Sequence, residues 1–185
     1  MVLIGVSGKI GSGKSTFAKY LVDNFNFIEM SLADPLKKAC QELFLLSDEQ
    51  VFGNQEQKGT IDNRWGKSPR ELLQFVGTDL LRNQMKYLIP DLHEDIFLKR
   101  FELWYNENKN VNVIVSDIRY PNELKYIKKS GGIVIKIERS NYDIHSNHSS
   151  ESSLNNEVFD FIINNNFDVD TFKNMIDIVM HDIIM

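Results

Sequence analysis

Residues Gly8 to Ser15 have the types and spacing of a phosphate-binding loop. Their sequence, Gly-Lys-Ile-Gly-Ser-Gly-Lys-Ser, fits the pattern G-x-x-x-x-G-K-[ST] in full. Glycines allow the backbone to curl around phosphate oxygens and to turn successive N–H groups inward. Lys14 can then reach the β- and γ-phosphates of a bound nucleotide, and Ser15 can bind Mg²⁺. The match lies between an apolar run and a helical pattern, which makes a chance occurrence improbable.

Asp117 is a candidate for the same metal site, because it follows the apolar run Val113-Ile114-Val115-Ser116. An acid at the end of a strand beside a phosphate loop can hold Mg²⁺ or its water ligands. The alternative is a solvated aspartate that opens the turn from Asp117 to Pro121. The phosphate loop favours the metal role.

Five arginines occur where ligands for anions would be needed, at expected helix starts, strand ends and a polar loop: Arg64, Arg70, Arg82, Arg119 and Arg139. Transfer of phosphate between two anions depends on positioning and charge neutralisation, so it requires such side chains. Each arginine alone would more often form a surface ion pair. Together they favour a kinase, and 185 residues leave little room for a motor or an oligomeric ATPase.

The elements that would position these residues alternate between short apolar strands and helices. Strands are predicted at 2–6, 27–32, 111–116, 133–138 and 159–163, and helices at 14–23, 35–46, 94–105, 121–130 and 170–184. Asp34 is predicted to cap the second helix, and Ser68 with Glu71 forms a capping box for a further helix. A mobile connection is predicted at 47–67 and a helix break near Gly77. The alternation predicts an α/β fold, a parallel sheet covered by helices on both faces.

Composition limits the classes of protein to consider. A net charge of −5 and a pI near 5.4 argue against binding of long nucleic acid, which favours a basic face. The single Cys40 excludes an internal disulfide and fits a reducing compartment. His145 and His148 have no third ligand at metal-site spacing, so we expect a solvated loop there. With no run of about 18 apolar residues and no signal-peptide pattern, we expect a single cytoplasmic domain with no membrane contact.

Five segments occur in order along the chain: Leu32–Lys37, Ser68–Gln74, Gly77–Asp79 with Arg82, Ser116–Glu123 and His148–Glu151. With the phosphate loop, they resemble the deoxynucleoside monophosphate kinases of bacteriophages and related viruses, within the nucleoside monophosphate kinase group of P-loop kinases. The most specific parts are Ser-Asp-x-Arg-x-Pro-Asn-Glu and Gln-x-x-Gly-Thr-Asp. The resemblance covers nearly the whole chain. It implies a nucleoside monophosphate kinase-like fold with five parallel strands, and transfer of the γ-phosphate of ATP to a deoxynucleoside monophosphate (dNMP) with Mg²⁺.

The resemblance also implies roles for individual residues. Lys14, Arg119 and Arg139 are expected to be catalytic, with Arg139 acting from a lid at about 139–157 that Glu151 anchors. Asn164 or Asn165, with Asn165 preferred, would border the adenine of ATP. The donor phosphates would bind Gly8, Gly11, Ser12, Gly13, Lys14, Ser15 and Thr16, with Ser15 and Asp117 at the metal. The acceptor would bind Asp34, Leu36, Lys37, Arg70, Gln74, Asp79 and Arg119, mostly within a helical region at about 34–106.

Several alternatives stay open at this point. Asp34 alone fits simple helix capping, and Gln74 fits a helix-surface amide. The chain could phosphorylate another small acceptor, as dephospho-coenzyme A and phosphomevalonate kinases do, or it could be an ATP-binding regulatory module. The sequence does not determine which base the acceptor carries or whether the enzyme prefers deoxyribose over ribose. It also does not determine whether the chain forms a homodimer.

Overall fold

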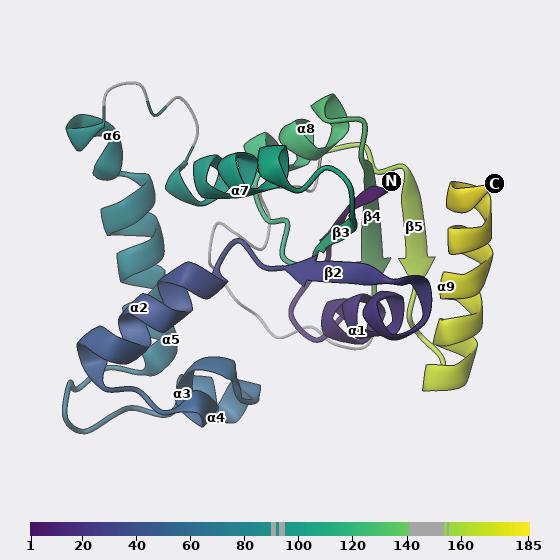
Figure 1. Cartoon of the computed structure of the whole chain (residues 1–185). Coiled ribbons are helices and arrows are strands. Elements are labelled where there is room, and N and C mark those ends of the chain that lie inside the picture. The colour runs from purple at the N-terminus through teal and green to yellow at the C-terminus, as the bar shows by residue number, and fades with distance from the viewer. Residues whose placement is uncertain (90–91, 93–94, 141–153, 155) are drawn as a thin grey trace. The chain divides into compact units, whose positions relative to one another are not determined.

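The computed structural model describes residues 1–89, 92, 95–140, 154 and 156–185 (Figure 1). The chain divides into two compact units. The sheet unit comprises Met1–Ser31 and Tyr105–Met185, and the helical unit comprises Leu32–Trp104.

The sheet unit contains five parallel strands in the order β2-β3-β1-β4-β5. Gly5 of the central strand β1 pairs with Val115 of β3 on one side and with Val134 of β4 on the other. This confirms the predicted five-stranded parallel sheet. The strands are β1 (Leu3–Ser7), β2 (Phe27–Met30), β3 (Asn112–Val115), β4 (Ile133–Glu138) and β5 (Phe161–Asn164).

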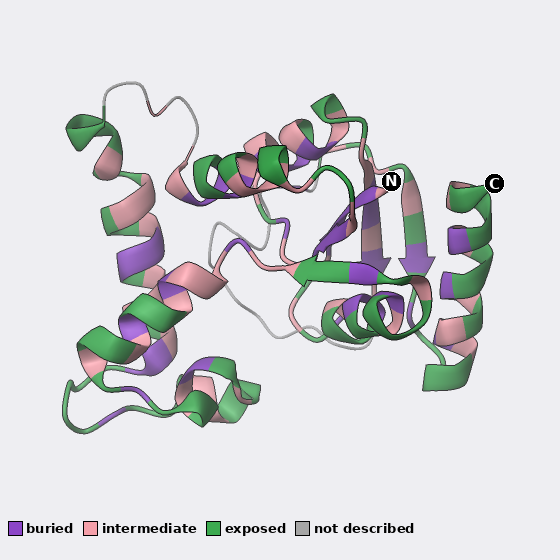
Figure 2. Ribbon diagram, viewed as in Figure 1, coloured by how far each residue is buried: buried purple, intermediate pink, exposed green. Residues whose placement is uncertain are grey.

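Helices cover both faces of this sheet. Ile4 and Val6 of β1 are fully buried in a core with residues of α1 (Lys14–Phe25) and α9 (Val169–Ile184). Between them, Gly5 faces the opposite side, where a Cβ atom would lie 3.1 Å from Ile127 of α8 (Pro121–Lys129). Side chains alternate between the faces of a strand, so α1 and α9 cover one face and α8 covers the other. Figure 2 shows the buried residues concentrated on the central strands of the unit.

Over its described residues, the helical unit contains six short helical segments before α7 (Ile96–Glu107), which begins within it. Two of these segments lie inside the stretch 47–67, where a mobile connection without helices was predicted, so the prediction missed both helices. Each begins with a capping box, formed by Ser47 with Gln50 and by Asn54 with Gln57. The segments are α2 (Asp34–Phe44), α3 (Asp48–Phe52), α4 (Gln55–Gly59), α5 (Pro69–Gln74), the π-helix η1 (Phe75–Arg82) and α6 (Met85–Leu88).

Two further local predictions in this unit are wrong. Asp34 does not cap α2: it is the first helical residue, Ala33 occupies the cap position, and Asp34 Oδ1 lies 2.7 Å from Lys37 Nζ. The helix does not break near Gly77 but continues as η1. A Cβ atom at Gly77 would lie 2.6 Å from Leu36 Cδ2, so this glycine permits close packing of α2 against η1.

The capping box at Ser68 is confirmed. The backbone N–H of Glu71 donates to Ser68 Oγ, and that of Ser68 donates to Glu71 Oε2 over 2.9 Å. The pKa of Glu71 is lowered to about 2 by the Ser68 backbone hydrogen bond, then by the Lys67 and Ser68 side chains.

Candidate active site

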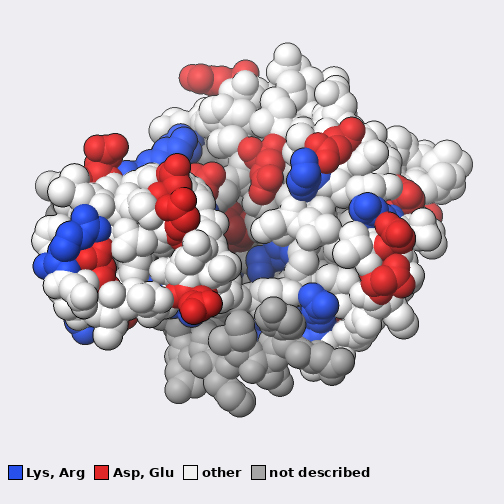
Figure 3. All heavy atoms as spheres, turned by 90° about the horizontal axis from the view of Figure 1, so that it is seen from below, with Lys and Arg blue, Asp and Glu red and all other residues white. Residues whose placement is uncertain are grey.

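The carboxyl ends of the five strands form one edge of the sheet, because all of them are parallel. In the order β2-β3-β1-β4-β5, the residues that directly follow the strands are Ser31, Ser116, Gly8, Arg139 and Asn165, and Asp117 comes one residue after Ser116. Ligand sites of open α/β sheets occur at this edge. The arrowheads of β4 and β5 point downward in Figure 1, and Figure 3 views the chain from that side. Among described residues, basic and acidic side chains are interspersed on the face drawn there.

The loop between β1 and α1 has the backbone that its glycines predict. Gly8 and Gly13 have φ angles of 153° and 109°, values that residues with a Cβ atom rarely adopt. A Cβ atom would also lie 2.4 Å from the carbonyl oxygen of Ile137 at Gly8, and 2.5 Å from Asn165 Nδ2 at Gly13. Both positions therefore require glycine.

The interior of this loop fits an anion. Lys14 Nζ donates to the carbonyl oxygens of Gly8 and Lys9, at 2.5 and 2.9 Å, so the ammonium group lies against the loop backbone. The hydroxyl of Ser12, a residue only 2% exposed, has no hydrogen-bond partner within the described part of the chain. The first turn of α1 carries no acidic residue, and the partial positive charge of a helix N-terminus attracts phosphate. The phosphate chain of a nucleotide suits this combination.

Asp117 lies beside the phosphate loop. The N–H of Ile118 donates to the carbonyl oxygen of Val6 over 3.0 Å, which places Asp117 next to the end of β1. Asp117 Oδ2 accepts a hydrogen bond from the hydroxyl of Ser31 at 2.8 Å. Sequence reasoning missed Ser31, since only the order of the strands shows that the ends of β2 and β3 are adjacent.

Ser15 and Asp117 supply hard oxygen atoms of the kind that Mg²⁺ prefers. No group of three His, Cys, Asp or Glu side chains with metal-site geometry occurs among the described residues. Mg²⁺ commonly takes only one or two protein ligands and completes its shell with water and substrate phosphates, so the residues present fit that ion.

The turn that carries Arg119 is held by a buried carboxylate. Glu123 is 1% exposed, and its Oε2 accepts hydrogen bonds from the backbone N–H groups of Arg119 and Tyr120, at 2.7 and 3.0 Å. The side chain of Arg119 itself is exposed. Glu123 belongs to the segment that carries the family resemblance, but sequence reasoning gave it no role.

Arg139 follows β4 directly, and the next residue is fixed to the end of β5. The N–H of Ser140 donates to Asn166 Oδ1 over 2.8 Å, and Asn166 Nδ2 donates to Ser140 Oγ over 3.0 Å. The side chain of Arg139 is exposed. Most of the predicted lid, including His145, His148 and Glu151, lies outside the described residues.

The predicted acceptor residues other than Arg119 lie in the helical unit, on two helical runs that pack together through Leu36 and Gly77. On α2, Lys37 pairs with Asp34 and lies 5.3 Å from the centre of the Phe52 ring. On α5, the Arg70 guanidinium donates to the carbonyl oxygen of Gln55. Gln74 is half-buried and Asp79 is exposed.

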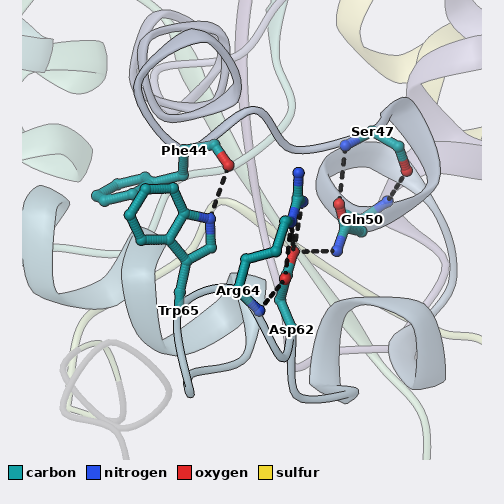
Figure 4. A network of polar contacts seen from close by, with 6 residues as sticks. All are labelled: Phe44, Ser47, Gln50, Asp62, Arg64 and Trp65. Atoms are coloured by element: carbon teal, nitrogen blue, oxygen red, sulfur yellow. Dashed lines mark hydrogen bonds and ion pairs between the residues drawn. The ribbon is translucent and has the colours of Figure 1, made fainter.

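Two of the five predicted anion-binding arginines pair with aspartates inside the helical unit. The Arg64 guanidinium donates to both carboxylate oxygens of Asp62, with Nε 2.9 Å from Oδ1 (Figure 4). These bonds, with a further one from Gln50, hold the pKa of Asp62 well below its usual range. Arg82 pairs with Asp95 and lies over the ring of Phe97 at 4.9 Å. Arg64 and Arg82 therefore stabilise the unit that carries them.

The parallel sheet carries a glycine loop between β1 and α1, and it carries the acid Asp117 shortly after β3. Together these features define a nucleotide-binding P-loop kinase. Across the described residues, no helix has the length and apolar character needed to span a bilayer.

The family model for deoxynucleotide monophosphate kinases matches residues 46–176, and the chain belongs to this family. The match begins after the phosphate loop, so the loop supports nucleotide binding independently of the family model. A protein of Acanthamoeba polyphaga mimivirus, provisionally named a deoxynucleotide monophosphate kinase, is 50% identical over 182 residues, which cover 95% of this chain and 94% of that protein.

One solved structure supports the fold at a TM-score of 0.50. Shikimate kinase from Bacteroides thetaiotaomicron aligns with a TM-score of 0.50 at 13% identity, covering 100% of this chain and 99% of that one. Dephospho-CoA kinase from Campylobacter jejuni aligns with a TM-score of 0.48 at 18% identity, covering 98% and 96%. At such identities a structural likeness concerns the fold alone.

Proposed function

We propose that this deoxynucleotide monophosphate kinase transfers the γ-phosphate of ATP to a dNMP by direct in-line displacement. The observation that carries the proposal is the loop from Gly8 to Ser15, with its buried Ser12 hydroxyl and its ammonium group at Lys14. The family match supports the dNMP as acceptor over the other small acceptors considered above.

Lys14 and the loop N–H groups would bind the donor phosphates. In this structure, Lys14 Nζ donates to two loop carbonyl oxygens. An arriving phosphate would exchange those neutral acceptors for anionic ones, which form stronger hydrogen bonds. Lys14 would then neutralise charge that develops on the transferred group. When bound at Ser15 and Asp117, Mg²⁺ would supply further charge neutralisation.

The acceptor side requires positioning rather than a strong base. A phosphate oxygen of the dNMP is already anionic at neutral pH, so no covalent enzyme intermediate is needed. We assign the clamp on the acceptor phosphate to Arg119, held in its turn by Glu123, and the charge over the transferring group to Arg139. In the helical unit, Lys37 is our candidate for the acceptor phosphate or its sugar, Arg70 for the phosphate and Gln74 for the base.

A coupled assay of ADP release tests the proposal. The four dNMPs, the matching ribonucleotides, dephospho-coenzyme A and phosphomevalonate would be offered as acceptors. We expect turnover with at least one dNMP, and turnover with none of the dNMPs would refute the proposal. Slow ATP hydrolysis that no acceptor accelerates would instead favour a regulatory module.

The variant Lys14→Ala tests the donor site. We expect turnover to fall on the order of a hundredfold, as for loss of one preorganised donor in other enzymes. Lys19→Ala is the matched control, because Lys19 lies on the same helix and forms an exposed pair with Asp23. Equal activity of the two variants would contradict the role of Lys14. The cytoplasmic location and the lid stay predictions, and the oligomeric state stays open.

A further inference from the structure

The side chain of Asn165 connects the end of β5 to the phosphate loop. Asn165 is only 8% exposed, and its Nδ2 donates to the carbonyl oxygen of Ser12 over 2.8 Å. Its backbone N–H donates to the carbonyl oxygen of Glu138 over 2.7 Å, which extends the pairing of β4 with β5. The residue is thus fixed by its backbone and holds the loop with its amide.

We infer that Asn165 is a positioning residue that orients the peptide between Ser12 and Gly13 for phosphate binding. This peptide is trans, so its C=O and its N–H point in opposite directions. The carbonyl of Ser12 points to buried Asn165, on the side where a Cβ atom at Gly13 would also lie 3.4 Å from the core residue Phe172. The N–H of Gly13 therefore points away from the core, toward the open side of the loop. The inference rests on the proposed binding of ATP phosphates there.

The contact is specific for a neutral amide. An apolar side chain would leave the buried carbonyl of Ser12 without its donor, which is unfavourable. A carboxylate would place a negative oxygen against that carbonyl and near the bound phosphates. The fit is also tight, since a Cβ atom at Gly13 would lie 2.5 Å from Asn165 Nδ2. This role differs from the adenine contact implied by the family resemblance, because it acts on the phosphates through Ser12 and Gly13.

Two ligands separate these roles in a calorimetric binding experiment: ADP, and inorganic tripolyphosphate, which has no adenine. The proteins compared are the wild type, Asn165→Ala and Asn165→Asp. The control is Asn24→Ala, in which an amide-to-carbonyl hydrogen bond of similar length, from Asn24 to Tyr20, is removed from the exposed end of α1. Melting temperatures establish that each variant is folded.

We expect Asn165→Ala to weaken the binding of both ligands about tenfold, the loss typical of one buried hydrogen bond. Asn165→Asp should weaken both more strongly and should recover as the pH is lowered, because a protonated carboxyl can donate to Ser12. Asn24→Ala should bind both ligands as the wild type does.

Three results would overturn the inference. If the variants lose affinity for ADP alone, Asn165 contacts adenine instead. If they bind both ligands as the wild type does, Asn165 has no part in binding. If the wild type binds neither ligand, the proposed function fails first, and the inference fails with it.

Discussion

Replacement of Glu123 by glutamine tests how the turn that carries Arg119 is held. The buried carboxylate accepts two backbone hydrogen bonds, from Arg119 and Tyr120. Hydrogen bonds to a charged group contribute about 1.5–3 kcal/mol each, against about 1 kcal/mol for neutral partners. Glutamine keeps the shape and one acceptor oxygen, so we expect the free energy of unfolding to fall by about 1–3 kcal/mol. For a chain of this size, the melting temperature should then fall by about 2–12 °C.

Thermal unfolding measures the loss of stability, and steady-state kinetics measure the effect on the KM for each substrate. Glu102→Gln is the stability control, because Glu102 forms a more exposed pair with Lys99, and we expect a change within about 0.5 kcal/mol. If Glu123 acts through Arg119, Glu123→Gln should raise the KM for the dNMP more than the KM for ATP. It should add little to the loss caused by Arg119→Ala, since coupled residues are not additive.

Two results would refute this reasoning. One is a Glu123→Gln protein as stable as Glu102→Gln, which would mean that the buried carboxylate contributes nothing. The other is a double variant in which the losses from Glu123→Gln and Arg119→Ala multiply as independent effects.

Two more predictions concern the helical unit. Gly77→Ala should lower the free energy of unfolding by about 1–3 kcal/mol through overpacking against Leu36. Urea unfolding of Gly77→Ala, Leu36→Ala and the double variant measures this effect. The double variant should lose less stability than the sum of the two single losses, and additive losses would contradict the contact. Because the folded pKa of Glu71, about 2, lies below its ordinary 4.5, its carboxylate stabilises the fold above pH 4.5, and this contribution is lost as the pH falls toward 2. The difference in melting temperature between wild type and Glu71→Gln should shrink across that window, whereas a difference independent of pH would count against the capping role.

Local signals were sufficient for much of the sheet unit. The apolar run 133–138 matches β4 at both ends, and the glycine pattern located the loop and the start of α1 at Lys14. The helical unit was harder to predict, because the glycines in the stretch 47–67 were given more weight than the capping boxes at Ser47 and Asn54. Those boxes can be read from the sequence as S-x-x-Q and N-x-x-Q, so α3 and α4 were detectable.

Long-range partners could not be predicted, for physical reasons. A guanidinium suits a carboxylate as well as a phosphate, so sequence alone could not show that Arg64 and Arg82 pair with aspartates. The amide of Asn165 bonds a residue 153 positions away. That contact follows from the order of the strands, which periodicity does not determine.

The central position of β1 has a consequence for synthesis of the chain. Ile4 pairs with Ile114 and Ile133, so the first strand has no neighbour in its sheet until more than 100 further residues are made. The loop that follows acquires its support from Asn165 later still. At about 5–20 residues per second, the 153 positions between Ser12 and Asn165 take roughly 8–30 s on the ribosome. Until β3 is made, the apolar β1 segment is exposed to wrong partners, and the nucleotide loop gains its full support only after Asn165 has been added.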